Sequence, residues 1–291
     1  MKWGLVGPAL LLLITLNIFP LVYNIRLSFT SATLTQSVDQ HKAIGTRNYA
    51  RIFESSEDNR YATALRTTGR YVILAVSLEL IFGYILALAL RRRFPCKPVV
   101  LLIFLVPMML SPAVMALFWN LIYDEEFGVL NQTLRVLGMI SLPGWKTDTA
   151  VKFYSVLLID VWMWTPFMML ISMAALNAIP TYLYEAAEID RAKPFTVFRR
   201  ITFPMSAPLL ILAALLRTTD ALKQFDYVMA VTGPNDPATQ TLSTLMYQVM
   251  FRNYKVGLGS AYSIVVLVIV VAVASLFIRY LDKLQHQQEM S

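Results

Sequence analysis

The 291 residues are 57% hydrophobic and 15% charged, with a mean hydropathy of +0.58. Soluble globular domains carry about 25% charged residues, so this composition excludes an ordinary soluble domain and indicates a membrane protein. The net charge of +7 does not predict a nucleic-acid-binding protein, because the basic residues gather at the ends of apolar stretches. The single cysteine, Cys96, excludes an internal disulfide bond, and no Cys/His cluster predicts a metal site.

Six stretches are long and apolar enough to cross a membrane, which takes about 20 residues. An open sheet cannot satisfy its backbone hydrogen bonds in lipid, so each stretch is expected to be a helix. The predicted fold is an all-α membrane protein in which the whole chain forms a single transmembrane domain. The first stretch is too long for the apolar core of a secretory signal and is expected to be retained. The predicted spans are 3–25, 71–90, 99–123, 153–179, 205–232 and 258–278.

The distribution of charge predicts how these helices are oriented. The loop at 91–97 carries three arginines and a lysine but no acidic residue, which indicates the cytoplasmic side. The loop at 124–150, on the opposite side, holds more acidic than basic residues. With six spans, both termini and segment 180–204 are then cytoplasmic. The longer loops at 26–70 and 233–256 are expected outside.

A charged, amphipathic segment at 180–204 separates the fourth predicted span from the fifth. Thr181 is expected to be the N-cap of a first short helix, and Pro194 to begin a second. From the residues alone, such a helix pair either lies on the inner leaflet or docks onto a soluble partner. The expected apolar stripe of the second helix consists of Phe195, Phe198 and Ile201.

The order of residues in this segment resembles the EAA loop of permease subunits of binding-protein-dependent ABC importers. The matching stretch is Glu185-Ala186-Ala187-Glu188-Ile189-Asp190-Arg191-Ala192, followed by Phe198 and Pro204. Further motifs in the family's order are Asn48-Tyr49, residues 127–131, 160–167 and 217–221, and Thr232-Gly233-Pro234. The chain most resembles one half of a heterodimeric pair related to the maltose, trehalose and glycerol-phosphate permeases of bacterial cytoplasmic membranes.

The resemblance implies partners and a role for the loop. In that family the loop forms helices that dock onto an ATPase subunit. The implied partners are a second related permease chain, two ATPase subunits and an extracytoplasmic substrate-binding protein. The family has glycine where this chain has Arg191, and an arginine with a positive φ would be disfavoured by about 1–2 kcal/mol. The implied ATPase-coupling residues are Glu185, Ala186, Ala187, Asp190, Arg191, Ala192, Phe195 and Phe198.

Ionisable residues inside the spans mark a possible substrate path, because burying a charge in lipid is costly. Arg217–Asp220 and Asp220–Lys223 are spaced i,i+3 and are expected to pair, as structural ion pairs or as the lining of a water-filled cavity. Asp160 lies near tryptophans, a combination that suits sugars, and Glu79 is expected to pair with a cation such as Arg217. The substrate-path candidates are Glu79, Asp160, Trp162, Trp164, Arg217, Asp220, Lys223, Gln224 and Asp226.

Other small and helix-breaking residues predict packing and kinks. Gly83 and Ala87 lie four residues apart and are expected to allow close helix packing. Proline is expected to kink the helices at Ser111-Pro112 and Thr165-Pro166.

The sequence also indicates how transport is energised. No glycine is followed by lysine, so the chain has no Gly-Lys-Ser/Thr phosphate loop, and no catalytic set of residues is evident. We expect a non-catalytic subunit that binds no cofactor, with ATP hydrolysis in a separate chain. The predicted function is ATP-driven import of a sugar or polyol. The alternatives are an ion-coupled secondary transporter of a small hydrophilic solute and an ABC importer of a non-sugar solute such as glycerol phosphate.

Overall fold

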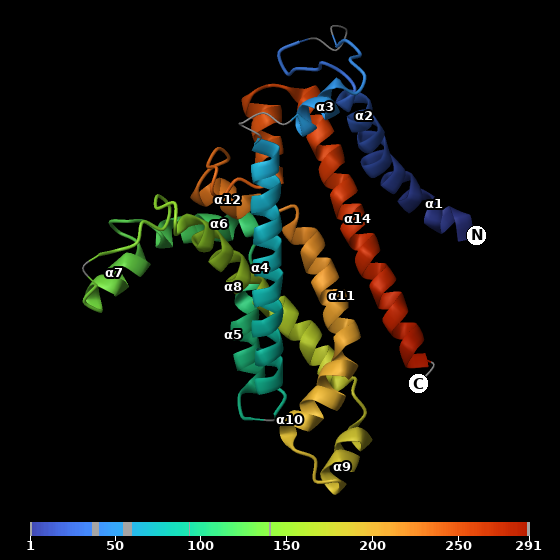
Figure 1. The fold of residues 1–291 in the computed structure, drawn as a ribbon, viewed down its shortest axis with the longest axis vertical. Helices are drawn as coiled ribbons and strands as arrows, with labels where there is room; N and C mark the ends of the chain where they lie inside the picture. The colour runs from blue at the N-terminus through green and yellow to red at the C-terminus, as the bar shows by residue number, and fades with distance from the viewer. Residues whose placement is uncertain (1, 37–40, 55–59, 93, 140, 290–291) are drawn as a thin grey trace.

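The computed structural model describes residues 2–36, 41–54, 60–92, 94–139 and 141–289 (Figure 1). Within these ranges the fold is all-helical, as predicted, apart from an isolated antiparallel bridge between Thr30 and Ala43. In chain order the helices are α1 (Lys2–Leu13), a π-helical segment (Ile14–Ile18), α2 (Phe19–Ser28), α3 (Arg47–Phe53), α4 (Arg60–Ala89), α5 (Lys97–Met109), α6 (Pro112–Ile122), α7 (Val129–Val136), α8 (Lys152–Asn177), α9 (Thr181–Ile189), α10 (Pro194–Val197), a π-helical segment (Phe198–Thr202), α11 (Phe203–Ala221), α12 (Asp226–Val231), α13 (Leu242–Tyr247), a π-helical segment (Gln248–Arg252) and α14 (Val256–Glu289).

In the described part of the chain, five helical stretches are long and apolar enough to cross a membrane. The pair α5 and α6 is a sixth candidate if it is counted as one bent span. The predicted number of spans therefore lies within the five to six that length and composition allow. The five stretches are Leu10–Ser28, Arg60–Ala89, Lys152–Asn177, Pro194–Ala221 and Val256–Lys283.

The predicted third span at 99–123, with its expected kink at Ser111-Pro112, bends more sharply than a kinked helix between α5 and α6. The two helices meet at an angle of 95°. Ser111 is extended, its hydroxyl accepts the N–H of Val114 at 3.3 Å, and Pro112 is the first residue of α6. Proline disfavours helical geometry in the residue before it, so the predicted kink here is a complete break. By contrast, α8 continues through Pro166 as one helix.

The predicted fifth span at 205–232 is not a single helix. The helix α11 ends at Ala221, and α12 begins only at Asp226. The carbonyl group of Gln224, in the break, accepts a hydrogen bond from the Thr241 hydroxyl at 2.8 Å. A partner from outside the helix therefore satisfies a backbone group that a continuous helix would have satisfied internally.

The bundle is centred on α4, α8 and α11, which pack against one another. A Cβ atom placed on Gly83 of α4 would lie 2.6 Å from Cβ of Met168 on α8, so the close approach of these helices requires glycine there. Ala87, one turn further, is fully buried, in agreement with the predicted packing role of this pair. The chain from α1 to α2 leans away from the bundle and contacts it through α14 (Figure 1).

The two ends of the bundle carry different elements. The short helices α9 and α10 lie at one end, and α3 lies at the other, near the end of α2 and the start of α14 (Figure 1). The hydrogen bond from Asn24 Nδ2 to Ser263 Oγ, 2.6 Å long, joins α2 to α14. The loop that follows α4 is at the same end as α9, because Arg91 lies over the ring of Tyr184 at 4.4 Å.

Candidate functional site

The segment 180–204 is built from α9 and α10 with a tight turn between them. The N–H of Ala192 donates to the carbonyl of Ala187 at 2.9 Å, and the N–H of Arg191 donates to Glu188 at 3.0 Å. These two bonds form a Schellman motif, which ends α9 with a residue in the left-handed region. That residue is Arg191, with φ of +52°. The turn geometry that favours glycine is therefore kept, and the arginine bears the steric cost.

The two helices begin differently from each other. Thr181 is the first residue of α9, Pro180 precedes it, and no side chain caps this helix, so the predicted Thr181 N-cap is wrong. Helix α10 begins at Pro194, as predicted, after an extended Lys193.

The side chains of this segment divide into an anchored set and an exposed set. Tyr184 and Phe198, together with Leu183 and Ile201, pack against a core cluster that is formed by α4, α8 and α11. Phe195 is 71% exposed, so the predicted stripe of Phe195, Phe198 and Ile201 does not form one packed surface. Ala187 and Ala192 are half-buried. The exposed residues among the predicted coupling set are Glu185, Ala186, Asp190, Arg191 and Phe195.

Four of the substrate-path candidates meet in the interior, at the junction of α4, α8 and α11. Arg217 Nε lies 2.9 Å from Glu79 Oε2, and its Nη2 donates to Glu79 Oε1 at 3.1 Å. Arg217 Nη2 also lies 2.5 Å from Asp160 Oδ1, and the Trp164 ring centroid is 4.8 Å from the guanidinium carbon. The three ionisable side chains are at most 2% exposed. The expected partner of Arg217, Glu79, is confirmed.

The remaining candidates do not join this cluster. The predicted Arg217–Asp220 pair is wrong, because Arg217 is held by the two carboxylates of α4 and α8. Asp220 is more than half exposed and pairs with Lys223 at 3.3 Å, as the i,i+3 spacing predicted. Asp226 begins α12 and is half-buried.

Trp162 lies apart from Asp160 and Trp164. It is two residues from Trp164 on α8, about 200° around the helix axis. It is 43% exposed and packs edge-to-face on Trp119, with ring centroids 5.6 Å apart. The structure therefore does not assemble Asp160 and both tryptophans into one site.

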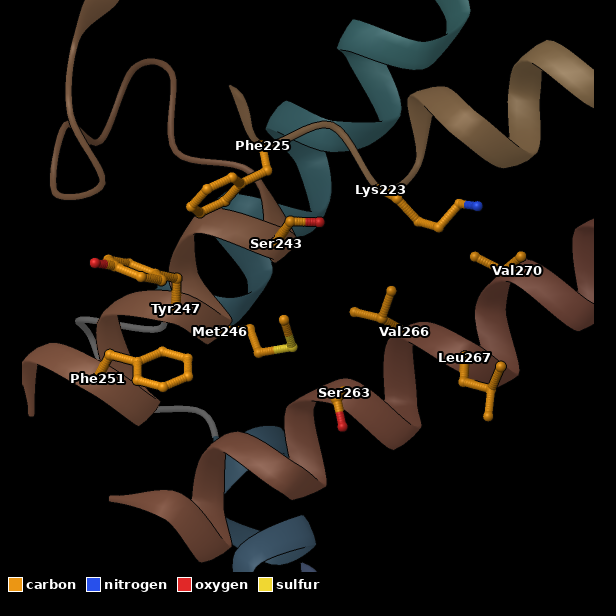
Figure 2. A pocket seen from close by; sticks show the side chains of 10 residues that line it. All are labelled: Lys223, Phe225, Ser243, Met246, Tyr247, Phe251, Ser263, Val266, Leu267 and Val270. Carbon is orange, nitrogen blue, oxygen red and sulfur yellow. The ribbon is translucent and has the colours of Figure 1, made fainter. Parts of the chain in front are cut away.

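A cavity of about 570 Å³ opens beside the break between α11 and α12. Figure 2 shows Lys223 at one side of this space and Phe225, Tyr247 and Phe251 gathered at the other. The ring centroids of Phe225 and Tyr247 are 5.3 Å apart, as are those of Tyr247 and Phe251. Residues of α14, among them Ser263, form the facing wall. Most of the lining is apolar, and aromatic rings, two serine hydroxyl groups and one cation are set into it.

Sequence reasoning found Lys223 but missed the aromatic wall of this cavity. Tyr247 and Phe251 are spaced i,i+4, a signal that they share a helix face, but nothing in the sequence brings them next to the α11–α12 break.

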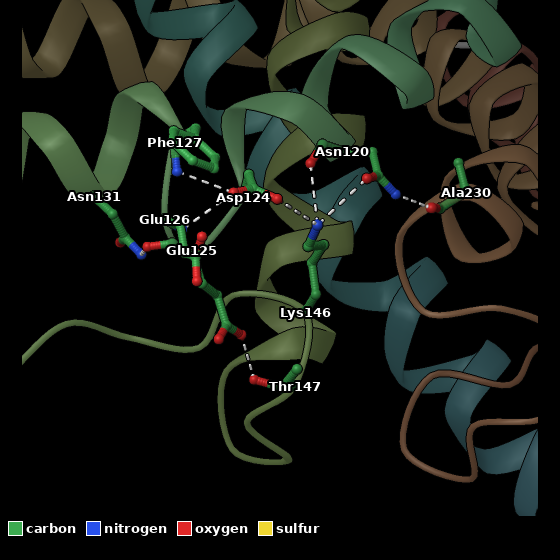
Figure 3. Close-up of polar contacts among 9 residues, drawn as sticks. All are labelled: Asn120, Asp124, Glu125, Glu126, Phe127, Asn131, Lys146, Thr147 and Ala230. Carbon is green, nitrogen blue, oxygen red and sulfur yellow. Dashed lines mark hydrogen bonds and ion pairs between the residues drawn. The ribbon is translucent and has the colours of Figure 1, made fainter.

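At the other side of the fold, a polar network organises the loop after α6 (Figure 3). Asp124 Oδ1 accepts the N–H groups of Phe127 at 3.0 Å and Glu126 at 3.1 Å. These bonds, with a smaller contribution from Lys146 at 3.7 Å, lower the pKa of the Asp124 carboxyl group. Lys146 also donates to the backbone and side-chain oxygens of Asn120, whose side-chain N–H donates to the carbonyl of Ala230. The network ties α6 to α12 and was not predicted.

Among the residues that the structure describes, no group of three or more His, Cys, Asp or Glu side chains is arranged to hold a metal ion. Among the described residues, the most deeply buried charged groups are the two carboxylates and one guanidinium of Glu79, Asp160 and Arg217, here called the Arg217 cluster.

Several known proteins are similar to this chain over most of its length. It is 34% identical over 275 residues to the probable ABC transporter permease protein y4oQ of Sinorhizobium fredii, covering 94% of this chain and 87% of that one. It is 36% identical to the trehalose/maltose transport system permease protein MalF of Thermococcus litoralis, covering 81% and 79%. It is 31% identical to the trehalose transport system permease protein SugA of Mycobacterium tuberculosis, covering 94% and 86%.

The fold is also similar to that of solved transporters. A chain of a bacterial ABC transporter involved in import of the acidic polysaccharide alginate superposes with a TM-score of 0.84 at 18% identity, covering 97% of this chain and 95% of that one. Residues 79–287 match the family model described as binding-protein-dependent transport system inner membrane component. With that match and relatives above 30% identity, the chain belongs to the family of inner-membrane components of binding-protein-dependent transport systems.

Proposed function

We propose that the chain is a permease subunit of an ATP-driven importer that moves a sugar or polyol across the bacterial cytoplasmic membrane. Two relatives are named as permeases for trehalose/maltose and for trehalose, which supports this class of solute. A third relative, the sulfoquinovosyl glycerol transport system permease protein SmoG of Agrobacterium fabrum, is 30% identical and extends the class to a glycosylated glycerol.

In the proposed topology the bent pair α5–α6 counts as one of six spans, and both termini are cytoplasmic. The contact between Arg91 and Tyr184 supports it, because it joins the basic loop at 91–97 to α9. Basic loops favour the cytoplasmic side. The segment 180–204 is then the cytoplasmic coupling loop.

The coupling loop is the main observation in favour of a separate ATPase partner. Its aromatic side chains Tyr184 and Phe198 are fixed to the bundle, while Glu185, Asp190 and Phe195 face solvent. A charged surface that is anchored from behind is suited to transmit force between a soluble partner and the membrane helices. The proposed assembly contains a second related permease chain, two separate ATPase subunits and an extracytoplasmic substrate-binding protein. The chain itself binds no cofactor and no nucleic acid.

The cavity beside the α11–α12 break is the proposed contact region for the solute. Sugars present hydroxyl groups that accept hydrogen bonds from an ammonium group such as that of Lys223. Their C–H faces pack on aromatic rings, which Phe225 and Tyr247 supply. The Arg217 cluster is proposed to hold three helices together rather than to touch the solute, because its side chains are buried.

Uptake into proteoliposomes that contain the complete complex tests this function. The proposal expects sugar uptake that needs ATP on the ATPase side and the binding protein on the other, and that survives collapse of the ion gradients. Uptake that stops on adding ionophores while ATP remains would favour the alternative, a secondary transporter. Uptake of glycerol phosphate but of no sugar would favour the other alternative, an ABC importer of a non-sugar solute.

A further inference from the structure

A cavity of about 230 Å³ lies at α3, at the end of the bundle away from α9 and α10 (Figure 1). It is formed by the chain that follows α2, by α3 and by the start of α14. Hydroxyl groups and cations provide most of its polar lining. The hydroxyl groups belong to Thr30, Ser31 and Thr33, and the cations to Arg47, Arg51 and Lys255.

Buried hydrogen bonds hold the walls of this cavity in place. Asn48 is 2% exposed, and its side-chain amide donates to the carbonyls of Ser28 and Thr30, both at 2.9 Å. The N–H of Gly257 on α14 donates to the carbonyl of Ala32 at 2.9 Å. A Cβ atom on Gly257 would collide with the Thr30 carbonyl, so this contact needs glycine. The cavity is therefore preformed, which lowers the entropic cost of binding a ligand.

Among the described residues that line the cavity, the charged ones are all basic. Arg47 and Arg51 are one turn apart on α3 and share a face of that helix. Lys255 comes from the turn before α14, where Tyr254 takes a positive φ of +58°. In the part of the chain that the structure describes, no carboxylate lines the cavity and none of these three cations forms an ion pair. Their mutual repulsion favours binding of an anion.

We propose that this cavity is an oxyanion site that accepts a carboxylate side chain of the extracytoplasmic substrate-binding protein, an inference that rests on the proposed function. Two arginines on one helix face suit a carboxylate, because guanidinium groups bind its two oxygens in a bidentate manner. The cavity lies beyond the end of α2 at Ser28 and before the start of α14 at Val256. A soluble partner reaches this position from outside the membrane.

The placement of the cations supports the same partner. Basic residues of membrane proteins are usually in excess on the cytoplasmic side. Arg47, Arg51 and Lys255 are at the end opposite the coupling loop, so they do not serve orientation. An acidic partner on the external side explains the presence of these three cations at that end of the bundle.

The test uses the complete transporter, with its partner permease and ATPases, in nanodiscs of phosphatidylcholine and phosphatidylglycerol. Affinity for the solute-loaded binding protein is measured at several NaCl concentrations. For the double variant Arg47→Gln/Arg51→Gln we expect binding about tenfold weaker at low salt and a shallower dependence on salt. Arg47→Lys/Arg51→Lys keeps the charges and is expected to restore most of the affinity. Arg66→Gln changes an exposed arginine of α4 outside the cavity and is expected to bind like the wild type.

Three outcomes overturn the proposal in distinguishable ways. If the Gln/Gln complex retains its ATPases and basal ATP hydrolysis but binds the binding protein as tightly as the wild type, the oxyanion site is wrong and the proposed function stands. If that variant instead loses bound phosphatidylglycerol, measured by mass spectrometry, with unchanged affinity for the binding protein, the occupant is a lipid headgroup. If the wild-type chain forms no complex with an ATPase, both proposals fail. Rescue of Arg51→Glu by an acidic-to-arginine change in the binding protein would support the site directly.

Discussion

Arg217 of α11 contacts both carboxylate oxygens of Glu79 on α4, at 2.9 and 3.1 Å, in the interior of the helix bundle. Asp160 of α8 contacts the same guanidinium group at 2.5 Å. One cation therefore joins three helices that lie far apart in sequence. Removing one member leaves the others charged and incompletely paired where water does not reach them, which is strongly unfavourable.

Glu79→Ala is expected to lower the free energy of unfolding by about 3–5 kcal/mol, because it breaks a buried ion pair. Thermal unfolding of the purified complex in detergent measures this loss. The matched control is Asp220→Ala, which breaks the exposed Asp220–Lys223 pair and is expected to cost no more than about 1 kcal/mol. Equal stability of the two variants would contradict a stabilising role for the Arg217 cluster.

Gly83→Ala is expected to destabilise the bundle by about 1–3 kcal/mol, because the added methyl group would enter the space of Met168 on α8. Gly69→Ala is the matched control on the same helix, since a Cβ atom there meets nothing within 4 Å. The control is expected to stabilise α4 by about 0.5–1 kcal/mol, as alanine does in helix interiors. Thermal unfolding measures the stability of both variants, and the two changes in the free energy of unfolding are expected to have opposite signs.

Arg191→Gly is expected to stabilise the turn after α9 by about 1 kcal/mol, because glycine adopts the positive φ without steric cost. Amide hydrogen exchange measures this gain: the amides of residue 191 and of Ala192 are expected to exchange more slowly in the variant. Arg199→Gly, in a helical segment with ordinary φ, serves as the control and is expected to destabilise by about 1 kcal/mol. Faster exchange in the Arg191→Gly protein would show that the arginine side chain makes a contact that outweighs the strain.

The predicted elements that proved correct are those set by local patterns. Long apolar stretches gave α4, α8 and α14, and Pro194 gave the start of α10. The break after Met109 was underestimated because the residues on both sides of it are apolar enough to continue a helix. The break after Ala221 was missed because no proline or glycine marks it. Whether the helix continues depends on partners elsewhere in the chain, such as Thr241, whose hydroxyl donates to the carbonyl of Gln224.

For the candidate sites too, spacing along the chain predicted some contacts, while contacts that depend on helix packing were missed. Spacing correctly predicted the Asp220–Lys223 pair, and the need for a buried counterion correctly suggested Glu79 for Arg217. Spacing could not show that Asp160 also pairs with Arg217, because that depends on how α8 is rotated against α11. Trp162 is two residues from Asp160 on the same helix, so helix geometry alone places it on the opposite side of α8.

The structure of the loop after α6 is expected to depend on pH through Asp124. Its pKa in the folded chain is lowered, first by the N–H of Phe127 and then by that of Glu126. The carboxylate therefore contributes stability at pH values above the unfolded value of about 3.8, and this contribution is lost as the pH falls through the lower folded pKa.

Hydrogen exchange at the Glu126 and Phe127 amides, measured between pH 6 and pH 3, follows this change. Protection is expected to be constant in the upper part of the range and to fall only at its acidic end. Asp124→Asn, which removes the charge at every pH, is expected to be less protected at pH 6 and to lack the acid-dependent fall. An identical profile for variant and wild type would show that the Asp124 charge does not hold this loop.

The central claim, that the exposed face of α9 docks onto a separate ATPase, is tested most directly by co-purification with Glu185→Lys. The variant reverses one exposed charge, and Glu126→Lys makes the same reversal in the loop after α6, away from α9. The amount of ATPase that is retained is measured per copy of the permease. The account predicts that Glu185→Lys loses most of its ATPase and its ATP-driven uptake, while Glu126→Lys keeps both. Wild-type levels of ATPase and uptake in Glu185→Lys would contradict it.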